Sequence, residues 1–256
     1  MHHGPGMKLA LLSDIHANLP ALRACLAHAR AQGVGQYAFL GDLVGYGAEP
    51  GPVLQQVMAL AAQGAWVLRG NHDVLALAPP ASAQSMGDTT AAWTHAQLDA
   101  EQKEFLAALP LTIEQGDMLL LHASADAPER WRYVQDARIA ALSLDAAAAR
   151  PQVRYVFGGH VHQQSLYYRS ATGKLMPFVP TPGVAVPVPR HRHWLATVGS
   201  VGQPRDGDPR AMYALFDAER ATLSFERVPY DWPAAAAAIR AAGLPEPLAE
   251  RLGQGR

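Results

Sequence analysis

The chain has 256 residues, of which 49% are apolar, and it carries a formal net charge of −1 and a single cysteine. This composition excludes a collagenous, disulfide-stapled or fully disordered protein. The near-neutral charge gives no electrostatic signature of binding to duplex nucleic acid, and no window reaches the ~18 consecutive apolar residues of a membrane helix.

The length suits one ordinary α/β domain. Residues 1–6 (MHHGPG) resemble the remnant of an expression tag, so we expect a single domain over residues 7–256. The lone Cys25 cannot form an internal disulfide, which fits a reducing compartment. We therefore expect a cytoplasmic protein with no membrane association, while the sequence does not indicate an oligomeric state.

The first half of the chain alternates short apolar runs with segments of helical periodicity. Strands are predicted at residues 8–12, 37–40, 66–68, 111–114, 118–121 and 153–157. Helices are predicted at residues 18–32, 52–63, 88–109 and 138–149.

The second half has the pattern of β-hairpins. Strands at 165–169 and 175–179 flank the turn Ala171-Thr172-Gly173. Further strands are predicted at 194–198, 211–216 and 222–228, and a late helix at 233–242. A βαβα half followed by hairpins predicts an α/β fold with two facing mixed sheets and helices outside.

Residues that can bind a metal ion follow five of the predicted strands. In chain order they are Asp14 and His16, Asp42, Asn71, His122, and His160 with His162. Ligands of open α/β sheets bind at the carboxyl ends of the strands, so we expect these side chains to converge. The members of the pairs Asp14/His16 and His160/His162 are two residues apart, and in extended backbone each pair projects to one side.

The donor types favour a particular chemistry. Carboxylate, amide and imidazole groups without a thiolate suit Mn²⁺, Fe or Zn²⁺ better than a structural Cys₄ zinc site. The seven donors are too many for one tetrahedral ion and are enough for two ions that share a carboxylate. Two ions about 3.5–4 Å apart can create a hydroxide nucleophile and stabilise an in-line displacement, which indicates hydrolysis of phosphate esters.

Five sequence blocks, SDIHAN, GDLVGYG, RGNHD, LLLHAS and GGHVH, resemble the calcineurin-like metallophosphoesterase superfamily. The resemblance implies a four-layer α/β/β/α sandwich with a dinuclear metal site on its rim. It implies one metal held by Asp14, His16 and His162, a second held by Asn71, His122 and His160, and Asp42 as the bridge between them.

The same resemblance implies roles for the rest of the RGNHD block. His72 is expected to contact the phosphate and to protonate the leaving oxygen, a contribution of about 10²–10⁴-fold. Asp73 is expected to orient the imidazole of His72. Arg69 matches an arginine that clamps phosphate oxygens in the protein phosphatase branch, a task that suits a guanidinium.

Aromatic residues near the metal motifs have two interpretations. Trp131 and Tyr133 are expected either to pack in the core or to stack on a nucleobase, and Tyr46 either lines the substrate cleft or packs under its loop. The polar segment from Pro79 to Thr90 is a candidate for a mobile cap over the site.

SDIHANLPAL, GDLVGYG and the loop at residues 199–206 resemble a bacterial branch of phosphodiesterases, diadenosine tetraphosphate hydrolases and phosphatases. We therefore expect a phosphodiesterase or nucleoside polyphosphate hydrolase that uses a metal-bridging hydroxide on a small phosphate ester or nucleotide. One alternative is a phosphomonoesterase or Ser/Thr protein phosphatase, although Gly45-Tyr46-Gly47 replaces the aspartate and arginine of that branch. The other is a non-catalytic protein-binding module of the same fold, which the complete set of ligand positions disfavours.

Overall fold

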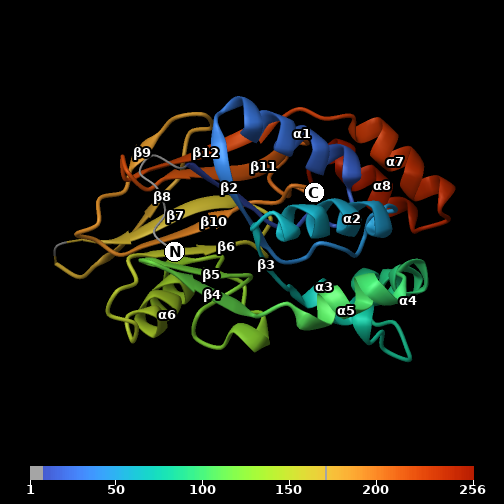
Figure 1. The fold of residues 1–256 in the computed structure, drawn as a ribbon, viewed down its shortest axis with the longest axis horizontal. Helices are drawn as coiled ribbons and strands as arrows, with labels where there is room; N and C mark the ends of the chain where they lie inside the picture. Colours follow the sequence, from blue (N-terminus) through green and yellow to red (C-terminus); the bar gives the residue numbers. More distant parts are fainter. Residues whose placement is uncertain (1–7, 171) are drawn as a thin grey trace.

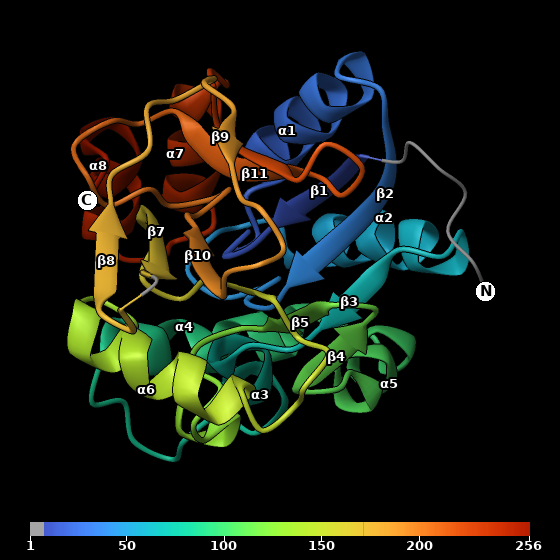
Figure 2. The ribbon, with the colours of Figure 1, turned by 90° about the vertical axis from the view of Figure 1, so that its left-hand side faces the viewer.

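The computed structural model describes residues 8–170 and 172–256, arranged as two six-stranded sheets that face each other (Figures 1 and 2). Residues 1–6 and Ala171 of the expected hairpin turn lie outside the described residues. No helix in the described ranges is both long and apolar enough to span a bilayer.

The first sheet combines parallel strands from the start of the chain with a hairpin from its end. Its order is β3 (Trp66–Leu68), β2 (Val34–Leu40), β1 (Lys8–Leu12), β11 (Ala211–Asp217), β12 (Thr222–Val228) and β9 (Val186–Pro187). Strands β1, β2 and β3 are parallel, and β11 joins β1 in antiparallel register, with Leu9 opposite Phe216.

The second sheet is also mixed. Its order is β4 (Thr112–Gln115), β5 (Met118–Leu121), β6 (Tyr155–Gly158), β10 (Trp194–Val198), β7 (Gln164–Arg169) and β8 (Leu175–Phe178). The parallel strands β5 and β6 lie side by side, so their carboxyl ends meet at one edge. Strands β7 and β8 form the expected hairpin.

Alternate residues of β1 serve two different cores. Leu9 and Leu11 pack between the sheets with Phe157 of β6, whereas Ala10 and Leu12 pack outward under the helices. A strand that is buried on both faces is apolar throughout, which explains the continuous run in the sequence.

Helices cover the outer faces of both sheets, as Figure 2 shows. The eight α-helices of the described ranges are α1 (Leu19–Ala31), α2 (Pro50–Ala62), α3 (Asn71–Leu77), α4 (Met86–Gln97), α5 (Ala100–Ala108), α6 (Ala137–Ala147), α7 (Trp232–Ala241) and α8 (Glu246–Gln254), with a 3₁₀ turn η1 (Pro128–Arg130). Helices α1 and α2 pack on the first sheet and α6 on the second. The architecture confirms the predicted α/β fold of two facing mixed sheets flanked by helices.

The single helix predicted at residues 88–109 is wrong, because the structure has two helices there. Leu98 is extended, and Asp99 starts α5 by accepting a hydrogen bond from the backbone N–H of Gln102, whose side chain accepts one from the N–H of Asp99. This reciprocal capping box begins a new helix. Helices α3 and α8 were not predicted.

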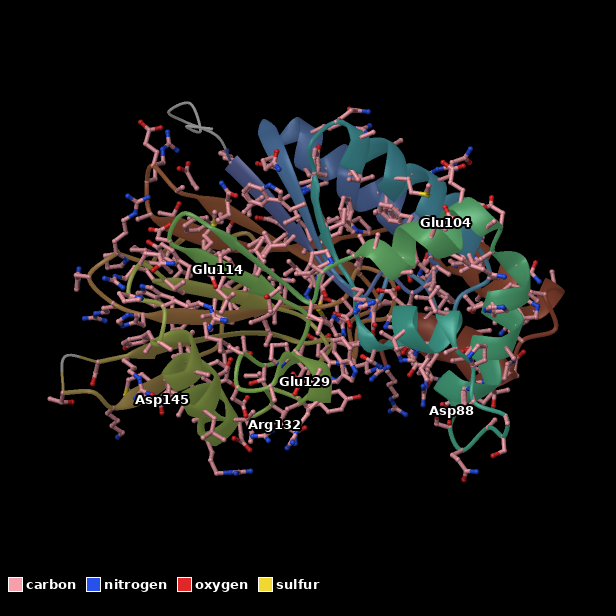
Figure 3. The ribbon with its side chains drawn as sticks, turned by 60° about the horizontal axis from the view of Figure 1, so that its bottom comes forward. Asp88, Glu104, Glu114, Glu129, Arg132 and Asp145 are labelled. Atoms are coloured by element: carbon pink, nitrogen blue, oxygen red, sulfur yellow. The ribbon has the colours of Figure 1, made fainter. Side chains whose placement is uncertain are left out.

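We predict that Asp99→Ala lowers the free energy of unfolding by about 1 kcal/mol, because the first turn of α5 loses its cap. Urea denaturation measures the change. Glu104→Ala is the matched control, since Glu104 lies exposed on the same helix (Figure 3) and its loss should change stability by less than about 0.5 kcal/mol. Equal effects of the two variants would contradict the capping role.

Candidate metal centre

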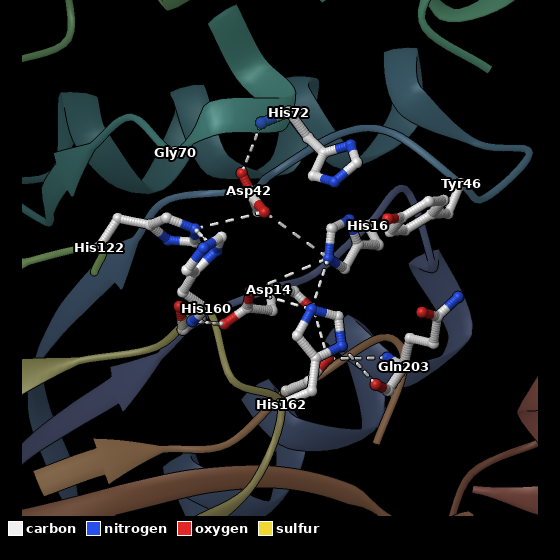
Figure 4. A network of polar contacts seen from close by, with 12 residues as sticks. Asp14, His16, Asp42, Tyr46, Gly70, His72, His122, His160, His162 and Gln203 are labelled. Carbon is white, nitrogen blue, oxygen red and sulfur yellow. Dashed lines mark hydrogen bonds and ion pairs between the residues drawn. The ribbon is translucent and has the colours of Figure 1, made fainter. Parts of the chain in front are cut away.

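Loops that follow strands of both sheets bring acidic and imidazole side chains together at one edge of the sandwich (Figure 4). Their donor atoms form two groups, each within 4.8 Å: a first group of Asp14, His16 and His162, and a second group of Asp14, Asp42, His122 and His160. All six residues are buried. The structure therefore places side by side six of the seven donors that the strand ends predicted to converge, Asn71 being outside these two groups.

The first group surrounds a carboxylate oxygen of Asp14. Asp14 Oδ1 lies 3.2 Å from His162 Nε2 and 3.9 Å from His16 Nε2. The two imidazole nitrogens are themselves only 3.1 Å apart. Three donor atoms thus point at one small volume.

The second group surrounds Asp42. Asp42 Oδ2 lies 3.3 Å from His122 Nε2 and 3.8 Å from His16 Nε2, and His122 Nε2 lies 3.2 Å from His160 Nδ1. Asp42 Oδ2 is therefore between a histidine of each group, which is the position that a bridging ligand needs.

Backbone carbonyls fix the orientation of all four imidazoles. The pairs are His16 Nδ1 with Val44 O at 3.3 Å, His122 Nδ1 with Leu40 O at 2.7 Å, His162 Nδ1 with Gln203 O at 2.6 Å, and His160 Nε2 with Trp131 O at 2.8 Å. A carbonyl can only accept, so the nitrogen that faces it carries the hydrogen in the neutral ring. The other nitrogen then presents its lone pair to the cluster, as metal-binding histidines do.

Each carboxylate divides its two oxygens between backbone and cluster. Asp14 Oδ2 accepts from the N–H of His160, and Asp42 Oδ1 accepts from the N–H of His72, both at 2.8 Å. Asp14 Oδ1, Asp42 Oδ2 and Asn71 Oδ1 are buried without a hydrogen-bond partner among the described residues. Buried polar atoms without partners are rare in folded proteins. The oxygens of Asp14 and Asp42 also lie beside imidazole nitrogens, an arrangement that fits metal cations.

The backbone at the donors is turned and not extended, which corrects the expectation for the two pairs. Asp14, His16, Asp42, His160 and His162 all have left-handed conformations, with φ between 49° and 68°. Such conformations are costly for residues with side chains and cluster at functional sites. The pairs converge because the chain turns sharply at each donor.

Gly70 and Gly159 allow neighbouring chain segments to approach the carboxylates. A Cβ atom on Gly70 would lie 2.2 Å from Asp42 Oδ1, and one on Gly159 would lie 1.9 Å from Ser13 Oγ. Both separations are far below contact distance, so any larger residue would displace the donors.

The charges of the site keep its carboxylates ionised. Burial is the largest single influence and opposes the charged form of Asp14, but His162 and His122 together outweigh it and hold the Asp14 pKa below its ordinary value. Burial is likewise the largest single influence on Asp42 and opposes its ionisation, but His122, His72 and His16 together outweigh it and lower the Asp42 pKa. These anions can therefore attract a cation over the whole physiological pH range.

The imidazoles respond differently to the same surroundings. Burial lowers the pKa of His16, and burial with the nearby His122 lowers the pKa of His160 to about 4. For His122, burial is the largest single influence and lowers the pKa, but the carboxylates of Asp42 and Asp14 together with the backbone hydrogen bond outweigh it and raise the pKa to about 9. Metal binding would release the proton of His122, because a ligand must offer its lone pair.

His72 lies beside the cluster with its ring buried. The ring centroid is 5.0 Å from that of His16 and 4.4 Å from that of Tyr46, and Gly45 and Gly87 pack closely against it. Burial lowers the His72 pKa, so the imidazole is neutral at physiological pH.

The structure gives Asp73 a role different from the expected one. Its Oδ1 accepts from the backbone N–H groups of Leu43 and Val44, and its Oδ2 accepts from that of Gly70. Its carboxylate therefore joins the loop of Asp42 to the start of α3, and these bonds do not orient the His72 ring. With burial as the largest cause and the charge of Asp42 the next, the Asp73 pKa rises to about 7.

The guanidinium of Arg69, expected to hold phosphate oxygens, makes one hydrogen bond to the backbone. Its Nη1 donates to the carbonyl oxygen of Ala107 at 3.4 Å, at the carboxyl end of α5. A cation is favourable there, because the last carbonyls of a helix carry partial negative charge. The structure therefore shows one contact of Arg69 at a helix end, and its expected contact with phosphate oxygens stays a prediction.

Both aromatic residues of the 131–133 segment contact metal-site histidines. The Trp131 ring meets the edge of His122 with centroids 5.9 Å apart. Tyr133 stacks on His160 with centroids 3.9 Å apart and remains 47% exposed. Tyr46 is close to both His16 and His72, with a centroid separation of 4.7 Å from His16.

Sequence reasoning assigned no role to two residues of the 199–206 loop. Gln203 accepts from His162, and Arg205 extends over the ring of Tyr46, with Cζ 5.8 Å from its centroid. The sequence of this loop resembles that of the bacterial branch, but none of its residue types indicates a contact with the metal site.

Comparisons with known proteins agree with this geometry. A family model described as the calcineurin-like phosphoesterase superfamily domain matches residues 7–221. An uncharacterised protein of Methanocaldococcus jannaschii is 32% identical over 97% of this chain and 98% of its own length. A metallophosphoesterase from Sphaerobacter thermophilus is 35% identical, with a TM-score of 0.86 over 98% of this chain and 100% of that chain. A hypothetical protein from Pyrococcus horikoshii OT3 shares the fold, at 20% identity and a TM-score of 0.75 over 98% and 99%.

We predict that Gly70→Ala weakens metal binding by about tenfold or more, because the new methyl group displaces Asp42. Metal content after dialysis, measured by inductively coupled plasma mass spectrometry, checks this. Gly51→Ala is the control, since its added Cβ meets its nearest atom, in the side chain of Gln102, at an ordinary 3.6 Å. Unchanged metal content in Gly70→Ala would contradict the required close approach.

Proposed function

Because the chain belongs to the calcineurin-like phosphoesterase superfamily and is a metal-dependent phosphoesterase, we propose that it hydrolyses phosphodiesters or nucleoside polyphosphates with two bound metal ions. The proposal of two ions rests on the two groups of donor atoms, which meet around Asp14 and Asp42. Mn²⁺, Fe and Zn²⁺ all suit imidazole and carboxylate donors.

Two bound ions would supply Lewis acidity and a nucleophile at neutral pH. One would be held by Asp14, His16 and His162, the other by Asn71, His122 and His160, with Asp42 between them. The carbonyl partners of the histidines keep these donors oriented before any substrate arrives. Such preorganisation means that little reorganisation is needed when charge develops on the phosphate.

His72 is the proposed proton donor to the leaving oxygen. The centroid of its buried ring lies 5.0 Å from that of His16, one of the proposed metal ligands. A neutral imidazole carries one N–H, which can donate to a phosphate oxygen. The dry surroundings strengthen that hydrogen bond.

Two features support a diester or nucleotide substrate. Gly45-Tyr46-Gly47 lacks the aspartate and arginine of the protein phosphatase branch. In addition, the exposed ring of Tyr133 lies directly on a metal-site histidine, where a nucleobase could stack. A non-catalytic binding module is disfavoured because every donor position is filled and backbone carbonyls orient the four histidines.

We predict about two metal ions per wild-type chain after growth or refolding with Mn²⁺, Fe or Zn²⁺. Asp42→Asn should reduce the total, because the amide loses the negative charge between the two groups. Metal analysis measures both, with Asp145→Asn on the exposed side of α6 as the control. Two ions retained in Asp42→Asn would refute the bridging position.

Turnover is predicted for diadenosine tetraphosphate and bis-p-nitrophenyl phosphate, and at most slow turnover for a phosphopeptide. His72→Ala should reduce kcat by about 10²–10⁴-fold, whereas His191→Ala, at an exposed position, should leave it unchanged. Product analysis across several added metals checks this. Cleavage of the phosphopeptide alone would reverse the substrate order, and absence of any cleavage would refute the proposed function.

A further inference from the structure

An open cavity of about 540 Å³ lies beside the metal centre. Its walls are Tyr46, the start of α4 from Ser85 to Gly87, Arg205, and residues of α8. This volume lies in the range of small-molecule binding sites. Figure 1 shows α4 and α8 at the same end of the molecule.

Tyr46 connects this cavity to the cluster. The centroid of the Tyr46 ring lies 4.7 Å from that of His16 and 4.4 Å from that of His72. Tyr46 also lines the cavity. A substrate with one phosphate at the metal centre would therefore extend past Tyr46 into this space.

The charged side chains of the cavity favour an anion. Arg205, Arg251 and Arg256 line it, opposed by Glu250 alone among its lining residues. Arg205 is held in place, since its Nε and Nη2 donate to Gln203 Oε1 at 3.2 and 2.7 Å. A guanidinium has five N–H donors, more than these bonds use, so the fixed group can still hold phosphate oxygens.

The outer wall comes from a part of the chain beyond the family match. The family model ends at residue 221, whereas α7 and α8 follow it. Their apolar faces form a core with Tyr46, Met86 and Trp93. This helical pair is thus packed onto the residues that border the active site, and it brings Arg251 to the cavity.

We propose that this cavity is a second anion subsite, in which Arg205 and Arg251 hold a further phosphate group of the substrate while the metal centre holds the phosphate that is cleaved. The proposal rests on the proposed function and narrows it. Substrates with two or more linked phosphates gain a contact that a simple diester lacks.

The kinetic test uses Arg205→Gln and Arg251→Gln in the full-length, metal-loaded enzyme. KM for diadenosine tetraphosphate should rise about tenfold to hundredfold, because a charged hydrogen-bond partner is lost. KM for bis-p-nitrophenyl phosphate should change less than about twofold. Arg30→Gln, at an exposed position of α1, is the matched control, and Arg251→Lys should restore part of the loss. Equal effects on both substrates, or none on either, would overturn the proposal.

A binding test separates this proposal from the proposed function. Calorimetry with pyrophosphate on metal-free wild-type protein should show binding that Arg251→Gln weakens about tenfold or more and Arg30→Gln retains. If no phosphate ester is hydrolysed but this difference appears, the proposed function fails and the subsite stands. If pyrophosphate binds equally to all three proteins, the subsite is refuted whatever the enzyme hydrolyses.

Discussion

The metal centre depends on one recurring interaction, the hydrogen bond from a histidine ring to a backbone carbonyl. Each of the four imidazoles makes it, and the acceptors are Leu40 at the end of β2, Val44 in the loop that follows β2, and Trp131 and Gln203 in two further segments. A free imidazole in water changes tautomer and rotates, whereas these rings have one nitrogen committed and the other directed inward. The site is therefore determined by main-chain positions, and any change that moves one of these segments changes the orientation of a donor in another part of the sequence.

The left-handed backbone of the donors follows from the same arrangement. Residues such as Asp14 and His160 must leave a strand, turn at once and face a neighbour, and φ near 50–70° achieves this within one residue. The conformational cost is offset locally, since the N–H of His160 donates to Asp14 and the N–H of His72 donates to Asp42. Each carboxylate thus uses one oxygen to accept a hydrogen bond from the turned backbone. Its other oxygen remains free to bind a cation.

The sequence was sufficient for the sheets and for the convergence of the donors, because a buried strand followed by a polar donor is a local pattern. The sequence did not predict hydrogen bonds between side chains and backbone groups that lie far apart along the chain. The carboxylate of Asp73 satisfies the N–H groups of Leu43 and Val44, and Arg69 reaches Ala107, and no spacing encodes such pairings. The break at Asp99 was visible as a capping box, but apolar periodicity on both sides concealed it. Arg205 was missed because its place beside Tyr46 depends on a loop that closes from the far end of the chain.

The metal donors and the proposed second subsite have different structural origins in this molecule. The donors lie on loops of the two sheets, where the main chain leaves little freedom, and Gly70 and Gly159 tolerate no larger side chain. The cavity beside them is bordered by α4 and α8, which are joined to the sheets through side-chain packing on Tyr46 and Met86. We expect replacement of α8 residues in that wall to alter the shape and charge of the cavity without moving a metal donor, because the donors lie on other segments. A helical pair appended after the last strand can thus change which phosphate compound is accepted while the hydrolytic centre stays the same.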